Sequence, residues 1–204
     1  MSIRTAQLSS GALETIRSQL SDLSTRPEVV QPDLALLAGA ANERTLQTAA
    51  PHDVYNLPLS ALGESLGPEA AVPVGVRCLI TSGDEPVGTV ELPEPDGSEG
   101  AITQHGPFTQ GTVDAIQAAE ESSDVADGNF ELRLLRVPAL YLMALWLKDE
   151  DGNQDLFVPL EPAPADLTPG HAYKWRELGE RLRPMARERL EAEDVDEPGP
   201  TATA

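Results

Sequence analysis

Residues 139–147 constrain the fold more than any other segment, because almost every side chain in this run is apolar. The run reads ALYLMALWL, and a strand that is apolar on both faces is typical of a central position in a sheet covered on both sides. A buried helix would fit the same run, but nine residues that end at a turn favour a strand. The turn lies at 149–153, and residues 156–160 return antiparallel. We therefore predict a core β-hairpin over 139–160, with the N-terminal and C-terminal helices on opposite sides of it.

Further segments alternate between apolar and polar residues, as half-buried strands do. Residues 72–80 (VPVGVRCLI) and 87–92 are separated by a Ser-Gly-Asp-Glu turn, which predicts a second hairpin. Residues 130–134 alternate as well, and Val137-Pro138 is predicted to bend or end that strand. The pattern leaves open whether 130–147 is one bent strand or two.

Apolar residues at helical spacing predict three helices. The first covers 10–24, and its apolar face is Leu13, Ile16, Leu20 and Leu23. The second covers 109–121 and the third 171–183, where Pro184 kinks or restarts the helix before it ends near residue 190. Asp33 could also cap a short helix that runs toward Arg44.

The order of these elements predicts an α+β protein. We expect an antiparallel sheet of about four to five strands, with N-terminal, middle and C-terminal helices packed on it. One domain should span 10–190, with a flexible N-terminus at 1–9 and a disordered acidic tail at 191–204. Its parts should be 10–71, mainly helical or irregular; 72–160, sheet-forming with an inserted helix; and 171–190, the C-terminal helix.

The net charge of −20, from 14 basic and 34 acidic residues, narrows the classes of partner. Such a field repels phosphate groups, so we expect no nucleic-acid binding and no contact with anionic membranes, while a protein partner remains possible. The excess of Arg over Lys, together with abundant Ala and Pro, is typical of a GC-rich bacterial genome.

The sequence predicts a cytoplasmic protein. Its N-terminus lacks the apolar stretch of a signal peptide, and no run approaches the length of about 18 apolar residues that a membrane helix needs. Cys78 is the single cysteine, so it can form no intramolecular disulfide, and its apolar surroundings predict a buried thiol.

No motif indicates a metal, a cofactor or a catalytic centre. His52, His105 and His171 lie far apart, without the spacing of metal ligands, and one cysteine cannot build a zinc site. The carboxylates of the turn at 149–155 lack the spacing of a calcium loop, which favours a solvated hairpin tip. The helix start at 106–112 offers backbone N–H groups to an anion, as any helix start does.

Four residues are candidates for a ligand site. A pocket between the loop 93–112 and the hairpin 139–160 would draw its polar groups from His105, Arg133, Arg136 and Tyr141. An inward-pointing arginine there needs a carboxylate partner such as Glu131, or an anionic ligand. The simpler alternatives are a solvated histidine and arginines that cover the sheet edge with their heads in water.

Charge is unevenly distributed along the chain. Residues 171–189 carry six basic and three acidic side chains, whereas the rest of the chain carries 8 basic and 31 acidic ones. The basic helix could dock on the acidic body or contact an acidic partner, and the acidic tail at 191–197 could screen it.

The absence of catalytic motifs and the amphipathic ends together predict a non-enzymatic accessory or protein-interaction protein. One alternative is a small-ligand-binding protein or uncharacterised enzyme that uses the pocket described above. Another is an acidic mimic of nucleic acid that binds a basic protein.

Overall fold

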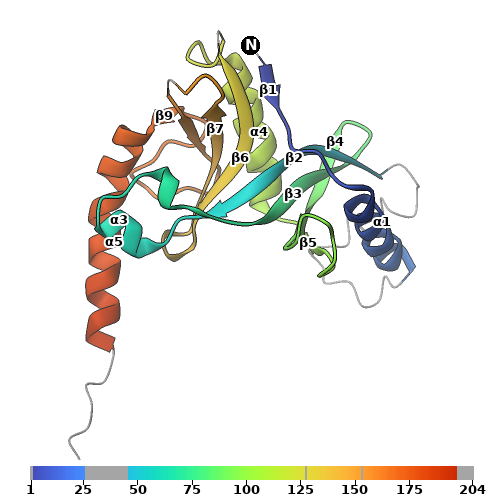
Figure 1. The fold of residues 1–204 in the computed structure, drawn as a ribbon, viewed down its shortest axis with the longest axis horizontal. Helices are drawn as coiled ribbons and strands as arrows, with labels where there is room; N and C mark the ends of the chain where they lie inside the picture. Colours follow the sequence, from blue (N-terminus) through green and yellow to red (C-terminus); the bar gives the residue numbers. More distant parts are fainter. Residues whose placement is uncertain (1, 26–45, 127, 153, 197–204) are drawn as a thin grey trace, which may run out of the picture.

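The computed structural model describes residues 2–25, 46–126, 128–152 and 154–196 (Figure 1). Over these residues the protein is α+β, with a mixed, largely antiparallel sheet of nine strands and four α-helices. The helix that the sequence predicts from Asp33 toward Arg44 and the end of the acidic tail, 197–204, lie outside the described residues.

The strands follow the order β5-β4-β3-β2-β6-β7-β8-β9 across the sheet, and β1 also pairs with β6. Their bounds are β1 Ser2–Arg4, β2 Leu46–Asn56, β3 Val72–Ser82, β4 Glu85–Leu92, β5 Ile102–Gln104, β6 Asn129–Val137, β7 Leu142–Asp149, β8 Leu156–Pro159 and β9 Tyr173–Lys174. The pairs β1–β6 and β2–β6 are parallel, and the other pairs are antiparallel. The sheet therefore has more strands than the four to five predicted, and it is mixed where a purely antiparallel sheet was predicted. Strands of two or three residues, such as β1, β5 and β9, are too short to show a period of two. The 11-residue strand β2 lies within 10–71, which the sequence predicted as mainly helical or irregular.

The two predicted hairpins are present as β3–β4 and β7–β8. The segment 130–147 is two antiparallel strands, β6 and β7. They are joined by the 3₁₀ turn η4, Pro138–Leu140, and by Tyr141, which is left-handed at φ 52°. The strand predicted to begin at residue 139 therefore begins at Leu142, because the proline and the left-handed residue occupy the start of the apolar run in a turn.

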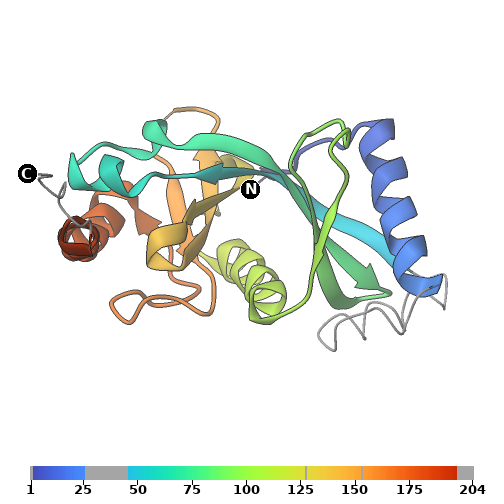
Figure 2. The same cartoon turned by 90° about the horizontal axis from the view of Figure 1, so that it is seen from below.

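The four α-helices are α1 Ser10–Thr25, α3 Leu59–Gly63, α4 Pro107–Glu121 and α5 Trp175–Asp196. Figure 2 shows α1 and α5 at the two ends of the sheet, with α4 between them. Each of these three helices covers its own buried cluster. Residues of α5 and α3 pack with Trp146 and Phe157, those of α4 pack with Leu134 and Leu145, and those of α1 pack with Cys78.

The central hairpin is thus covered on both faces, but not by the helices predicted from the sequence. The final helix α5 covers one face and the middle helix α4 covers the other, whereas α1 packs on β3 and β4. The amphipathic pattern of a helix predicts that it buries one face, and it carries no information on which surface receives that face.

Both ends of the described chain are more ordered than the sequence indicates. The predicted flexible N-terminus contains β1, which pairs with β6 in register Ser2 to Asn129, and Ala6 N–H donates to the Pro51 carbonyl at 2.8 Å. Helix α5 runs to Asp196, beyond the predicted end near residue 190. Extending an existing helix fixes one residue per new hydrogen bond, so Glu and Ala residues prolong it at little cost.

Gly111 brings α4 against the backbone of Glu161. A Cβ at position 111 would overlap the Glu161 carbonyl oxygen, which is a rigid backbone atom. Alanine favours a helix by about 1 kcal/mol over glycine, yet overpacking here typically costs about 1–3 kcal/mol. We therefore expect Gly111→Ala to lower the urea midpoint. Glu120→Ala, at an exposed position of the same helix, is the control, and a higher midpoint for Gly111→Ala would contradict the packing.

Candidate functional site

A cleft of about 520 Å³ opens on the face of the sheet that α5 covers. Strands β2, β6 and β7, the β7–β8 turn, the 3₁₀ turn η3 (Pro68–Ala70) and the start of α5 all contribute to its lining. Its central side chains are Tyr55, Arg133, Trp146, Lys148, Asp155 and Trp175. Both tryptophans of the chain therefore line one cleft, although only 4% of all residues are aromatic.

Arg133 is held at the centre of this cleft by two aromatic rings. It lies directly across from Trp146 in the β6–β7 register. Its guanidinium carbon is 5.0 Å from the Tyr55 ring centroid and 5.1 Å from the Trp146 ring centroid. Both distances are within the range of cation–π attraction. Rings from β2 and β7, the two strands that flank β6, thus hold the guanidinium group in place.

The Arg133 guanidinium is also fixed along one edge. Its Nε donates to Glu131 Oε1 at 3.0 Å, which is the pairing that the sequence raised as one possibility. The side chain is 19% exposed. Among the described residues, no hydrogen bond from its two terminal nitrogens is found, so these donors are available to a ligand.

Asp155 fixes the Trp146 ring and the β7–β8 turn together. Trp146 Nε1 donates to Asp155 Oδ2 at 2.8 Å, the Lys148 ammonium lies 3.1 Å from the same oxygen, and Asp149 N–H donates to Oδ1 at 3.1 Å. Trp146 also contacts Tyr55, with ring centroids 5.2 Å apart. The sequence placed Asp155 on a solvated hairpin tip, whereas it is a partly buried anchor of the cleft wall.

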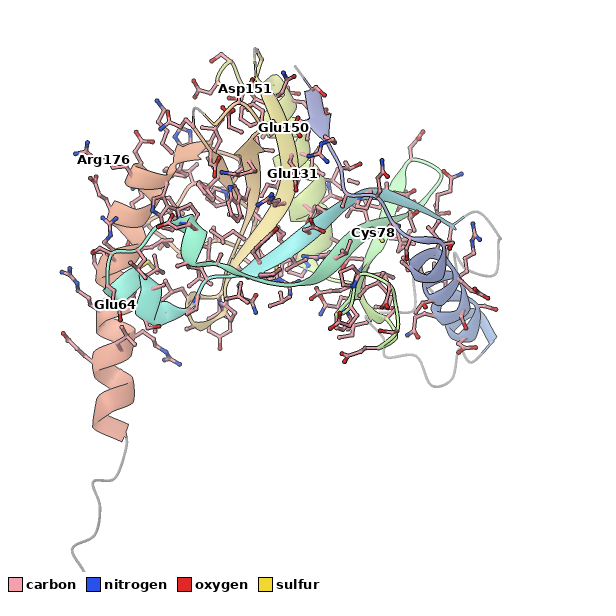
Figure 3. All side chains as sticks on the ribbon, in the orientation of Figure 1. Glu64, Cys78, Glu131, Glu150, Asp151 and Arg176 are labelled. Atoms are coloured by element: carbon pink, nitrogen blue, oxygen red, sulfur yellow. The ribbon has the colours of Figure 1, made fainter. Side chains whose placement is uncertain are left out.

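A chain of charges extends from Arg133 to the N-terminal strand. Glu131 accepts from Arg133 and, at 3.0 Å, from Arg4, whose Nε donates to Glu150 at 2.7 Å. Figure 3 shows Glu131 and Glu150 beside β1. The Arg133 hydrogen bond lowers the pKa of Glu131, which keeps this carboxylate ionised and in place. Burial, reinforced by the Glu131 charge, raises the pKa of Asp53 on the neighbouring strand.

Burial shifts the pKa of two further groups, one in the cleft and one in the core. Burial raises the pKa of Tyr55, so its phenol stays protonated. Cys78 does not line the cleft and is buried, as predicted. Burial raises the pKa of its thiol to about 12. Among the described residues no group of three or more His, Cys, Asp or Glu side chains could hold a metal ion.

The four residues proposed from the sequence do not form one site. Side chains alternate along a strand, so Arg133 and Arg136 point to opposite faces of β6. Arg133 lies in the aromatic cleft, while Arg136 and Tyr141 line a second pocket of about 350 Å³ on the α4 face. This second pocket lies between the 93–112 segment, represented by Gln104, and the β6–β7 turn. His105 follows Gln104, and its Nδ1 lies 2.9 Å from the Val87 carbonyl oxygen.

Sequence reasoning missed most of the cleft. The sequence predicted 139–147, which contains Trp146, as a core strand, and attached no role to Tyr55. The only available signal was the scarcity of aromatic residues, which makes each exposed aromatic surface notable. Nothing local indicates that Tyr55 and Trp146, 91 positions apart, make an edge contact across β6, the strand that lies between β2 and β7.

Comparison with known proteins finds no matching family model, curated protein or solved structure. No helix in the described part of the chain has the length and apolar character needed to cross a membrane.

Proposed function

We propose that this chain is a non-enzymatic protein-interaction protein whose aromatic cleft binds a carboxylate-bearing segment of a partner protein. One observation carries the proposal. The Arg133 guanidinium lies over the rings of both Tyr55 and Trp146 and is tethered at Nε by Glu131, and its terminal nitrogens have no partners among the described residues.

A carboxylate is the group that this geometry suits best. The two terminal nitrogens of a guanidinium form a planar fork that matches a carboxylate through two parallel hydrogen bonds. Because the aromatic rings and Glu131 already restrict the Arg133 side chain, little further side-chain entropy would be lost on binding. Such pre-organisation is the usual source of affinity at a small interface.

The shape and charge of the cleft favour a protein segment as the ligand. Its half-buried Trp175 and Tyr55 offer the aromatic surface that is enriched at interaction hot spots. Its charged lining residues are three cations and two carboxylates, a local positive excess in a chain of net charge −20. Arg176, one of these three cations, is 88% exposed at the start of α5 (Figure 3), where its Nε lies 3.2 Å from Glu180 Oε1.

Intrinsic fluorescence tests the proposal directly, because both tryptophans line the cleft. The probes are two capped peptides, acetyl-Ala-Phe-Glu-Phe-Ala-amide and the same peptide with Gln in place of Glu. We expect the Glu peptide to change the tryptophan emission saturably and to bind at least about tenfold more tightly than the Gln peptide, since one charge-assisted bidentate pair exceeds 1.4 kcal/mol.

The variant Arg133→Lys distinguishes bidentate hydrogen bonding by the guanidinium group from simple attraction to a positive charge. A lysine ammonium keeps the positive charge but cannot donate two parallel hydrogen bonds, so we expect the affinity for the Glu peptide to fall about tenfold or more. Arg187→Lys, at an exposed position of α5, is the matched control and should bind like the wild type. Circular dichroism verifies that both variants are folded. Equal binding of the Glu and Gln peptides, or wild-type affinity in Arg133→Lys, would show that the proposal is wrong.

A further inference from the structure

A row of polar side chains is buried on the α4 face, opposite to the aromatic cleft. His52 on β2 pairs in register with Arg77 on β3, which pairs with Glu91 on β4. Arg136 reaches across from β6, and its two terminal nitrogens both donate to the carboxylate of Glu91. His52 and Arg77 are 0% and 1% exposed, so this row belongs to the interior of the protein.

Positive charge in this row exceeds negative charge. Glu91 is the carboxylate closest to both Arg77 and Arg136 in this row, and both of its oxygens accept hydrogen bonds from Arg136. Arg77 donates instead to Thr89 Oγ1 at 3.2 Å and to Met143 Sδ at 3.5 Å, and its Nε has no partner among the described residues. Burial, with the Arg136 charge as a second cause, lowers the pKa of Arg77 to about 10, so the guanidinium stays charged at neutral pH.

A buried charge without a counter-charge is unfavourable, and an anion bound nearby would relieve it. The second pocket provides a place for such an anion. Met143, which contacts Arg77, also lines this pocket of about 350 Å³. The volume is at the lower end of the range of about 300–1,000 Å³ that is typical of small-molecule sites.

The walls of the pocket divide into a polar and an apolar part. Arg136 and Asn56 supply the polar part, and Phe108, Tyr141 and Leu142 supply the apolar part. Arg136 Nε and Asn56 Oδ1 are both buried and have no hydrogen-bond partner in the described structure. One is a donor and the other is an acceptor, and unpaired buried groups of this kind are rare in folded proteins.

We propose that this pocket binds a small carboxylic acid that carries an apolar group and a hydrogen-bond donor next to the carboxylate, such as an N-acyl amino acid. The carboxylate accepts from Arg136 Nε and balances the excess charge of the two arginines. The neighbouring N–H donates to Asn56 Oδ1, and the apolar group packs between Phe108, Tyr141 and Leu142. The first turn of α4, which contains Phe108, adds the partial positive charge of a helix start.

Methyl NMR with N-acetyl-leucine as the probe tests this site in the full-length chain. The chain has three methionines, Met1, Met143 and Met185, so each labelled methyl signal can be assigned by substitution. We expect N-acetyl-leucine to shift the Met143 signal saturably and to leave Met185, on α5, unchanged. N-acetyl-leucinamide, which has no negative charge, should bind at least about tenfold more weakly.

Three variants assign the binding to the proposed groups. Tyr141 is 84% exposed and left-handed, a conformation that asparagine accepts, so Tyr141→Asn should fold normally and lose about tenfold in affinity with the apolar wall. Tyr141→Phe keeps the ring and should bind like the wild type. The double variant E91L/R136L removes both members of the ion pair, keeps the net charge, adds no methionine signal, and should abolish the Met143 shift.

Three outcomes would overturn the proposal. One is the absence of any Met143 shift with either probe, and another is equal affinity for the acid and the amide. The third is wild-type affinity in folded Tyr141→Asn. Tryptophan emission is recorded in the same titrations, so binding at the aromatic cleft on the opposite face is detected separately.

Discussion

Replacing Trp146 by alanine is expected to lower the free energy of unfolding by about 3–5 kcal/mol, the usual effect of truncating a buried aromatic residue. The Trp146 side chain is 4% exposed and joins parts of the fold that are distant in sequence. Its ring contacts Tyr55 on β2 and Phe157 on β8, at centroid distances of 5.2 and 5.8 Å. Its Nε1 donor anchors Asp155, and its face supports Arg133, so the same change should also destroy the aromatic cleft.

The measurement is urea denaturation followed by far-ultraviolet circular dichroism, because the substitution removes one of the two fluorophores. Trp146→Phe is the control, since it keeps an aromatic ring in the stack and loses only the Asp155 hydrogen bond and some volume. We expect it to cost about 1–2 kcal/mol. If the midpoint of Trp146→Ala remained close to that of the wild type, this ring would not be part of the core.

Acid should destabilise the protein through His52. This imidazole is 0% exposed, and its Nδ1 lies 2.7 Å from the Ala50 carbonyl oxygen. Burial lowers the pKa of His52 from 6.5 to about 4, against the effect of the Ala50 hydrogen bond and with help from the charges of Arg77 and Arg136. Between these two values the unfolded state binds more protons than the folded state, so stability falls as the pH decreases.

The expected loss between pH 7 and pH 4 is about 3 kcal/mol from this residue alone. Urea midpoints measured at intervals over this range give the slope of stability against pH. His52→Asn keeps a donor near the Ala50 carbonyl oxygen and removes the titrating group, so its slope should be smaller than that of the wild type. His171→Asn, at an exposed position, controls for the substitution itself. Equal slopes in the wild type and His52→Asn would show that His52 is protonated alike in both states.

The two binding proposals use opposite faces of one strand. Arg133 and Arg136 are three positions apart on β6, and each is the polar centre of a different pocket. Each arginine also has a carboxylate partner, Glu131 or Glu91, that fixes its side chain. The proposals can therefore be tested separately, with tryptophan emission for the first and the Met143 methyl signal for the second.

Several features could be predicted from the sequence because their signals are local. The alternation in 72–92 and the apolar runs in 139–160 predicted both hairpins, and the spacing of apolar residues predicted α1, α4 and the start of α5. The apolar surroundings of Cys78 predicted that it is buried, and the residue is 1% exposed. Turn chemistry and hydrophobic period act over a few residues, so the amino-acid sequence alone is sufficient for them.

The sites could be predicted only in part. Arginines beside an apolar strand were recognised as candidates, and the Arg133–Glu131 pair needs only two positions on one strand. The partners of Arg136 and Trp146 are different, since Glu91 lies 45 positions from Arg136 and Tyr55 lies on β2. Such contacts depend on the parallel pairing of β2 with β6, and no local pattern specifies that pairing.

By itself, then, the sequence determined the α+β class, the two hairpins and the three longer helices, and it identified Arg133 and Arg136 as candidate ligand-binding residues. Only the tertiary structure decided which helix covers which face, that β6 pairs with both β1 and β2, and that the two arginines serve separate pockets. The physical reason is that hydrophobic burial is non-directional. It determines that a face must be covered, while strand register and chain connectivity determine which residues meet there.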